Sequence, residues 1–378
     1  MLRAVKRLVL VLLAACGTEG PATGTPDSSG VPDGAAAGRL EVQALGVQGF
    51  LLRYGGEAVL SSPLFTRQST FEVGANIPLE ADTQAIESGL AGQPLGELRA
   101  IISGHPHYDH FIDVPHIMTL APGARTYTNL SGRHMLAALA PDRPGCQGTP
   151  SPVIARDRVI ALDDSFASHV DYTNCPDQRP AGAPLEGSWI TVPGTRIRMM
   201  AFCSMHPDQI GPIHFGEGSV DTDQCELPEA ASGWLEGKTL AFLVDFLDAA
   251  GEPAFRVFYQ DAPTDAPLGQ VPAALIAAHP VDLALLCVGS NDAVENEPTA
   301  ILENIRPRFA LGGHWEDFFD DASAQPEPLP FLDVDEYVRR AEAALPGPPD
   351  RPLVENGVDR PVRHVLVQPG TRFTIPAR

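Results

Sequence analysis

Short apolar runs alternate along the chain with turns rich in glycine, proline or charged residues. The first three runs, at residues 40–45, 49–54 and 58–61, lean toward β-structure, and Gly46 and the pair Gly55-Gly56 separate them. They predict an opening meander of three strands. Further strands are predicted at residues 98–103, 125–129, 159–162, 189–192, 195–202, 239–246, 255–260, 283–288, 309–311, 364–368 and 372–375.

Helices are predicted between some of these strands. They cover residues 79–90, 112–120, 132–139 and 333–345, and the last is amphipathic. Alternating strands and helices predict a mixed α/β fold. Two irregular stretches, near residues 141–187 and 207–237, are predicted to be insertions. The second is interpreted as a substrate-facing cover with His214 as a contact, because loops of this length inside a domain usually serve function.

Residues able to bind a metal concentrate in one stretch, SGHPHYDHFIDVP at residues 103–115. His105, His107, Asp109 and His110 follow the apolar run at 98–102, and alternate residues of an extended segment share a side. Imidazole and carboxylate together suit zinc, iron or manganese better than calcium or magnesium. His105 and His107 are expected to share one metal, and Asp109 and His110 to face a second. A histidine-rich surface loop is the alternative, but so dense a cluster at a strand end disfavours it.

This H-x-H-x-D-H pattern after a strand resembles the signature of the metallo-β-lactamase superfamily. The resemblance implies an α/β fold of the four-layer αβ/βα sandwich type over roughly residues 38–375. It also implies that His105, His107 and His206 hold one metal, that Asp109, His110 and His314 hold another, and that Asp261 bridges them. The cofactors would be two divalent ions, zinc by default, with manganese or iron as alternatives. A bridging hydroxide would be the nucleophile and Asp109 the catalytic residue that orients it.

Some positions depart from the family pattern or leave the assignment open. Asp261 lacks the glycine and hydroxyl residue that usually flank the bridging carboxylate, so a turn-initiating aspartate is its alternative and Asp265 the fallback ligand. Glu316 and Asp317 could orient imidazoles or face solvent. A lone histidine in a helix, His116, is not predicted to be a ligand.

The first residues predict export. MLRAVKRLVLVLLAACG has a basic start, a short apolar run and small residues before Cys16. We expect a lipoprotein signal peptide at residues 1–16, a flexible tether at 17–38 and the metallo-hydrolase domain at 39–378. Cys16 would carry the lipid, which would place the protein in a bacterial cell envelope as an exported, membrane-anchored lipoprotein. An ordinary signal peptide is the alternative.

Charge and cysteines narrow the picture further. The formal net charge of −22 opposes binding to nucleic-acid phosphates, so no nucleic-acid partner is expected. An exported protein can form disulfides, and pairs are expected between Cys146 and Cys175 and between Cys203 and Cys225, each flanking an insertion. Cys287 lies in an apolar run and is expected to be a buried thiol.

The predicted activity is hydrolysis of an ester, lactone or phosphodiester in a small-molecule or lipid-like substrate at the envelope. Within the superfamily the resemblance is nearest to the ascorbate-6-phosphate lactonase-like and N-acylphosphatidylethanolamine phospholipase D-like branch. A β-lactamase-type amide hydrolase and a non-catalytic metal- or ligand-binding lipoprotein are the alternatives. The sequence does not indicate an oligomeric state.

Overall fold

A computed structural model describes residues 38–163, 186–209, 213–320 and 325–378. All of them belong to one compact unit, Ala35–Arg378. The predicted signal peptide and tether, at residues 1–37, lie outside the described residues, as does Cys175. No helix in the described part of the chain is both long enough and apolar enough to cross a membrane.

Two β-sheets form the centre of this unit. The first has the strand order β14-β13-β16-β1-β2-β3-β4-β5-β6 and the second the order β15-β12-β11-β10-β9-β8-β7. The strands of the first sheet are β1 (Arg39–Gly46), β2 (Gly49–Tyr54), β3 (Glu57–Ser61), β4 (Leu98–Ile102), β5 (Arg125–Thr128), β6 (Val159–Ala161), β13 (Leu353–Glu355), β14 (Val358–Arg360) and β16 (Arg372–Pro376). Those of the second are β7 (Ile190–Thr191), β8 (Ile197–Cys203), β9 (Leu240–Leu247), β10 (Pro253–Gln260), β11 (Leu283–Cys287), β12 (Phe309–Gly313) and β15 (His364–Leu366).

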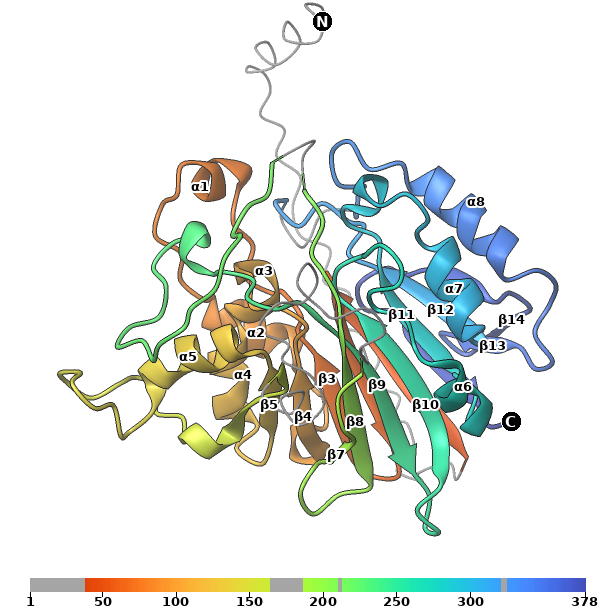
Figure 1. Ribbon diagram of the computed structural model, residues 1–378, viewed down its shortest axis with the longest axis horizontal. Helices are drawn as coiled ribbons and strands as arrows, with labels where there is room; N and C mark the ends of the chain where they lie inside the picture. The colour runs from red at the N-terminus through yellow and green to blue at the C-terminus, as the bar shows by residue number, and fades with distance from the viewer. Residues whose placement is uncertain (1–37, 164–185, 210–212, 321–324) are drawn as a thin grey trace, which may run out of the picture. The chain divides into compact units, whose positions relative to one another are not determined.

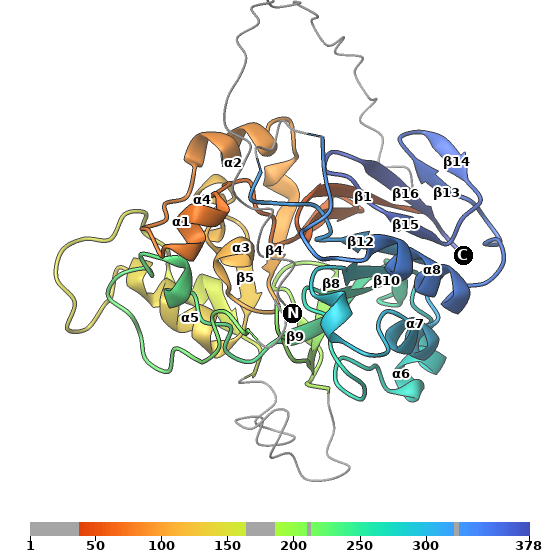
Figure 2. The ribbon, with the colours of Figure 1, turned by 90° about the horizontal axis from the view of Figure 1, so that it is seen from above.

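The helices fall into two sets. The first set is α1 (Thr70–Gly74), α2 (Thr83–Gly89), α3 (Tyr108–Phe111), α4 (Val114–Leu120) and α5 (Leu130–Leu136), and the second is α6 (Ala273–Ala278), α7 (Thr299–Ile305) and α8 (Val334–Ala344). Short 3₁₀ turns occur at Leu95–Glu97, Ala137–Leu139, Arg156–Arg158, Ala231–Gly233 and Asn291–Ala293. Figures 1 and 2 show α2, α4 and α5 on one flank of the sheets and α6, α7 and α8 on the other.

Three apolar cores hold the layers together, and strand β9 contributes side chains to two of them. Phe242, Val244 and Phe246 point into the core between the two sheets, where Phe50 of β2 also lies. Leu243 points the opposite way, toward α7 and α8. Side chains of a strand alternate between faces, so one apolar strand serves two cores, and each fully buried side chain contributes about 2 kcal/mol.

A third core packs the outer face of the first sheet against α2, α4 and α5. With the two cores described above it gives helices, sheet, sheet and helices in succession. The prediction of a four-layer αβ/βα sandwich is confirmed.

The predicted strands are present with small changes at their ends, but α1, α6, α7 and the hairpin of β13 and β14 were not predicted. The second hairpin strand, β14, is exposed throughout, so it carries no apolar pattern. Helices α6 and α7 are short, at six and seven residues.

The predicted disulfides are wrong. Cys146 pairs with Cys225, with 5.3 Å between the Cα atoms, and so links the first insertion to the second. Cys203 is also disulfide-bonded, and Cys287 is a buried free thiol as expected. The two insertions also contact each other through Arg143, which donates from Nη1 to the carbonyl of Cys225.

Candidate metal centre

Strand ends bring the predicted ligands together. The segment after β4 carries His105 and His107, and His107 is the N-cap of helix α3, which carries Asp109 and His110. The sequence predicted a loop here, but a short helix carries Asp109 and His110, which belong to a different ligand group from the first two histidines. His206 follows β8 and His314 directly follows β12.

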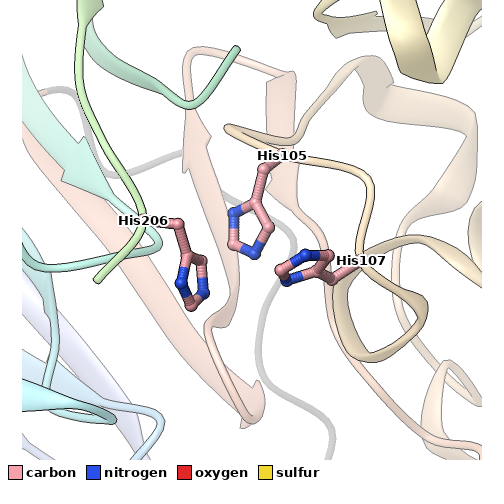
Figure 3. A group of neighbouring side chains, drawn as sticks. All are labelled: His105, His107 and His206. Atoms are coloured by element: carbon pink, nitrogen blue, oxygen red, sulfur yellow. The ribbon is translucent and has the colours of Figure 1, made fainter. Parts of the chain in front are cut away.

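His105, His107 and His206 form the first ligand group. Their ring centroids are 4.5 Å apart for His105 and His107, 4.7 Å for His105 and His206, and 4.9 Å for His107 and His206. Figure 3 shows the three rings close together, with His105 and His107 on the segment after β4 and His206 on a separate segment.

One nitrogen of each ring already has a partner. His105 Nδ1 lies 3.1 Å from Asp261 Oδ1, His107 Nε2 lies 3.3 Å from the carbonyl of Gly216, and His206 Nδ1 lies 2.7 Å from the carbonyl of Pro207. These oxygens accept, so the protons sit on the three named nitrogens and lone pairs remain on His105 Nε2, His107 Nδ1 and His206 Nε2. His105 Nε2 is buried and has no hydrogen-bond partner among the described residues. The group therefore fits a metal ion that binds through three imidazoles.

Asp109, His110 and His314 form the second group. His314 Nε2 lies 3.2 Å from His110 Nε2 and 3.3 Å from Asp109 Oδ2, and His110 Nε2 lies 3.5 Å from the same oxygen. Ligands bound tetrahedrally to zinc at 2.0–2.1 Å are separated from one another by about 3.3 Å. The three atoms are thus spaced as ligands of one small divalent ion.

Burial sets the charge of these groups. It lowers the pKa of His105, His107 and His110 to about 3 and that of His206 well below its usual value, so the imidazoles are neutral at neutral pH. Burial alone would raise the pKa of Asp109, but the adjacent His110 and His314 hold it well below its ordinary value. Neutral imidazole and ionised carboxylate are the forms that bind metals.

Asp261 is at the predicted place but belongs to neither group. Its Oδ1 contacts His105 Nδ1, and its Oδ2 accepts a 2.6 Å hydrogen bond from the backbone N–H of Gly104. A Cβ on Gly104 would lie 2.1 Å from Asp261 Oδ1, so only glycine allows this approach. In these contacts Asp261 orients an imidazole, and its bridging role stays a prediction. The fallback ligand, Asp265, is exposed and belongs to neither group.

Glu316 is buried, yet it contacts no imidazole in the described structure. Its Oε1 accepts a 2.5 Å hydrogen bond from the N–H of Val47, whose carbonyl in turn accepts from the N–H of His314. Glu316 thereby fixes the turn that holds the His314 backbone. Asp317 instead caps the N–H of Phe319, and His116 pairs with Glu87 at the surface.

The structure contains a third group of possible metal ligands that the sequence did not predict. It consists of His206, His214 and Glu236. Burial raises the pKa of Glu236 to about 7. A single glutamate in an irregular segment cannot be identified as a metal ligand from its sequence context. Only the suggested role of His214 as a substrate contact indicated that this segment is functional.

No protein-family model matches the chain, and no curated protein matches it in sequence. The structure is similar to the metallo-beta-lactamase fold protein YhfI from Bacillus subtilis, at 11% identity and a TM-score of 0.43, covering 88% of this chain and 98% of that one. It is also similar to Igni18, a metallo hydrolase from Ignicoccus hospitalis, at 12% identity and a TM-score of 0.45, covering 90% and 100%. A third is CmlA, a diiron beta-hydroxylase from Streptomyces venezuelae, at 11% identity and a TM-score of 0.42, covering 90% and 54%.

Proposed function

We propose that the protein is a binuclear metal-dependent hydrolase of the metallo-β-lactamase superfamily. The observation that carries this is the pair of adjacent ligand groups at the strand ends, one of three imidazoles and one of two imidazoles and a carboxylate. The two groups are neighbours, since the ring centroids of His105 and His110 lie 4.5 Å apart. Zinc is the expected metal because these ligands match its preferences, and manganese and iron are accepted by similar sets.

The protein side chains prepare the site for hydrolysis. Two bound divalent ions would supply an activated water near neutral pH and polarise the oxygen of the group under attack. Asp261 holds the Nδ1 proton of His105, which leaves Nε2 free to bind. Asp109, ionised and facing the second group through Oδ2, can accept a hydrogen bond from the attacking water and orient it. Phe318 packs edge-on to His314, with ring centroids 5.2 Å apart, and excludes water from that side.

The proposed substrates are esters, lactones or phosphodiesters in small or lipid-like molecules. What supports this is the sequence resemblance to the lactonase-like and phospholipase D-like branch. The net charge of −22 disfavours nucleic acids. A lipid on Cys16 would hold the enzyme at the envelope membrane, near such substrates. Metabolic labelling with a fatty acid tests the anchor, and the label should be absent from a Cys16→Ser variant.

A panel of substrates tests the activity. Zinc-loaded protein should hydrolyse at least one of a generic aryl ester, a lactone and a bis-aryl phosphate, and Asp109→Ala should reduce the rate at least about 100-fold because the water loses its orientation. Asp265→Ala, which changes an exposed aspartate after β10 that belongs to no ligand group of the described residues, is the control and should keep the wild-type rate.

The same panel with a β-lactam added separates the alternatives. Turnover of a β-lactam alone would favour the amide-hydrolase alternative. Two bound zinc ions without turnover of any member would favour a metal- or ligand-binding lipoprotein.

A further inference from the structure

A histidine between two carboxylates lies beside the first ligand group, on the insertion near residues 207–237. His214 Nε2 is 2.8 Å from Glu236 Oε2, and His214 Nδ1 is 3.4 Å from Asp208 Oδ1. The His214 ring lies 5.5 Å from the His206 ring, and Glu236 Oε2 lies 4.0 Å from His107 Nε2. The insertion thus adds three ligand-type side chains that the two main groups do not use.

The backbone fixes Glu236 in this place. Its N–H donates to the carbonyl of Gly216, and its own carbonyl accepts a 2.6 Å hydrogen bond from Asn129 Nδ2. Gly216 is also the residue whose carbonyl contacts His107. The position of Glu236 is therefore coupled to that of a ligand in the first group.

We propose that His206, His214 and Glu236 form an auxiliary site for a divalent cation such as zinc, which passes the ion to the first ligand group. One ligand atom from each of the three residues lies within 4.8 Å of the others, and a mixed imidazole and carboxylate set suits zinc. Asp208 lies beside it as a further carboxylate. The charge of Glu236 and Asp208 draws a cation to this place.

The exposure of the auxiliary site, and His206, which it shares with the first ligand group, indicate that the ion moves from the auxiliary site to the first group. The side chains of His214 and Glu236 are 18% and 14% exposed, whereas that of His105 is 0% exposed. A cation arriving from solvent can reach the auxiliary site directly. Because Nδ1 of His206 is bonded to Pro207, only its Nε2 is free, and the auxiliary site and the first group must compete for it. The cation stays at the auxiliary site when the first group is broken.

Zinc stoichiometry tests the proposal without any measurement of turnover. A His105→Ala/His107→Ala variant, freed of metal and reloaded with zinc, should bind two equivalents by elemental analysis, one in the second group and one at the auxiliary site. Adding His214→Ala or Glu236→Gln should remove one equivalent. Adding His134→Ala should change nothing, because His134 pairs with Asp223 in a similar geometry but belongs to no ligand group of the described residues.

Kinetics of loading in the intact centre give the second test. His214→Ala alone should keep two equivalents but take up zinc several-fold more slowly than wild type. The proposal is overturned if the His105→Ala/His107→Ala variant holds the same amount of zinc with and without His214, or if uptake is unchanged in His214→Ala. Those results would leave Asp208, His214 and Glu236 as an ion-paired chain, and the hydrolase proposal would stand. If the variants bind zinc in the expected amounts but the zinc-loaded wild-type protein hydrolyses no substrate, only the hydrolase proposal is contradicted.

Discussion

The Nε2 atoms of His110 and His314 lie 3.2 Å apart, although 204 residues separate the two histidines along the chain. Two imidazole nitrogens at this distance share either a proton or a cation. Burial keeps His110 neutral, and Asp109 Oδ2 lies within 3.5 Å of both nitrogens. A bound cation would bond to all three atoms at once, so folding and metal binding should be coupled.

The first prediction follows from this coupling. Removing metals with a chelator should lower the melting temperature, and zinc should restore it, because an ion at 1,000 times its dissociation constant stabilises the fold by about 4 kcal/mol. His314→Ala should lose one of two zinc equivalents and part of the thermal shift. His116→Ala, which changes a surface histidine paired with Glu87, is the control. A melting temperature indifferent to zinc would contradict the metal centre.

The second prediction distinguishes two roles of Asp261. In Asp261→Asn an NH2 group replaces one carboxylate oxygen. This group donates and cannot accept, so the amide cannot accept from Gly104 and His105 through two separate oxygens as the carboxylate does. If Asp261 orients His105, zinc in the first group should weaken roughly 10–100-fold while the second group is unchanged. If Asp261 bridges the metals, both affinities should fall together. Competition titration with a zinc chelator measures both, with Asp265→Asn as the control.

The third prediction concerns Gly216, whose carbonyl contacts His107. A Cβ at this position would lie 2.7 Å from His107 Nε2, and the φ angle of +68° already favours glycine. Gly216→Ala should displace His107 and weaken zinc binding in the first group at least several-fold. The matched control is Gly218→Ala, which has φ +118° but whose nearest neighbour, Leu235 Cδ1, is 3.6 Å away. Equal losses in the two variants would mean that loop strain, and not the contact with His107, is responsible.

The local sequence is enough to bring the first four candidate ligands together, for a physical reason. His105, His107, Asp109 and His110 are adjacent in sequence and follow a buried strand, so the local pattern already brings them together. His206 and His314 are single residues after strands, and their sequence positions alone do not place them near residue 105. Their convergence depends on the places of β8 and β12 in the second sheet, where β9, β10 and β11 lie between them. The family resemblance implied this convergence, and the residue pattern did not.

Other features depended on tertiary contacts that leave no mark in the sequence. Glu236 lies beside the first ligand group because its backbone is hydrogen-bonded to both Gly216 and Asn129. The disulfide between Cys146 and Cys225 joins residues 79 positions apart, whereas the prediction paired cysteines that are nearer in sequence. Proximity along the chain was therefore a poor guide to the pairing of Cys146 and Cys225.

The last prediction concerns Glu297, a buried carboxyl outside the three ligand groups. Burial raises its pKa to about 8, although the Gln260 side chain donates a hydrogen bond to it. The folded protein therefore keeps this proton up to about pH 8, whereas the unfolded chain releases it near the ordinary value of 4.5. Between these values the folded state binds more protons, so the free energy of unfolding should fall as the pH rises, by on the order of 3 kcal/mol.

Glu297→Gln removes the ionisable group and keeps the shape, so this variant should lose most of that decline and be more stable than wild type at pH 8. Urea unfolding at pH 5 and pH 8 measures the difference. Glu295→Gln, two residues away and exposed, should decline as wild type does. If Glu297→Gln declines as steeply as Glu295→Gln, the carboxyl at 297 is already ionised in the folded protein, and a cation or an unseen partner must stabilise it there.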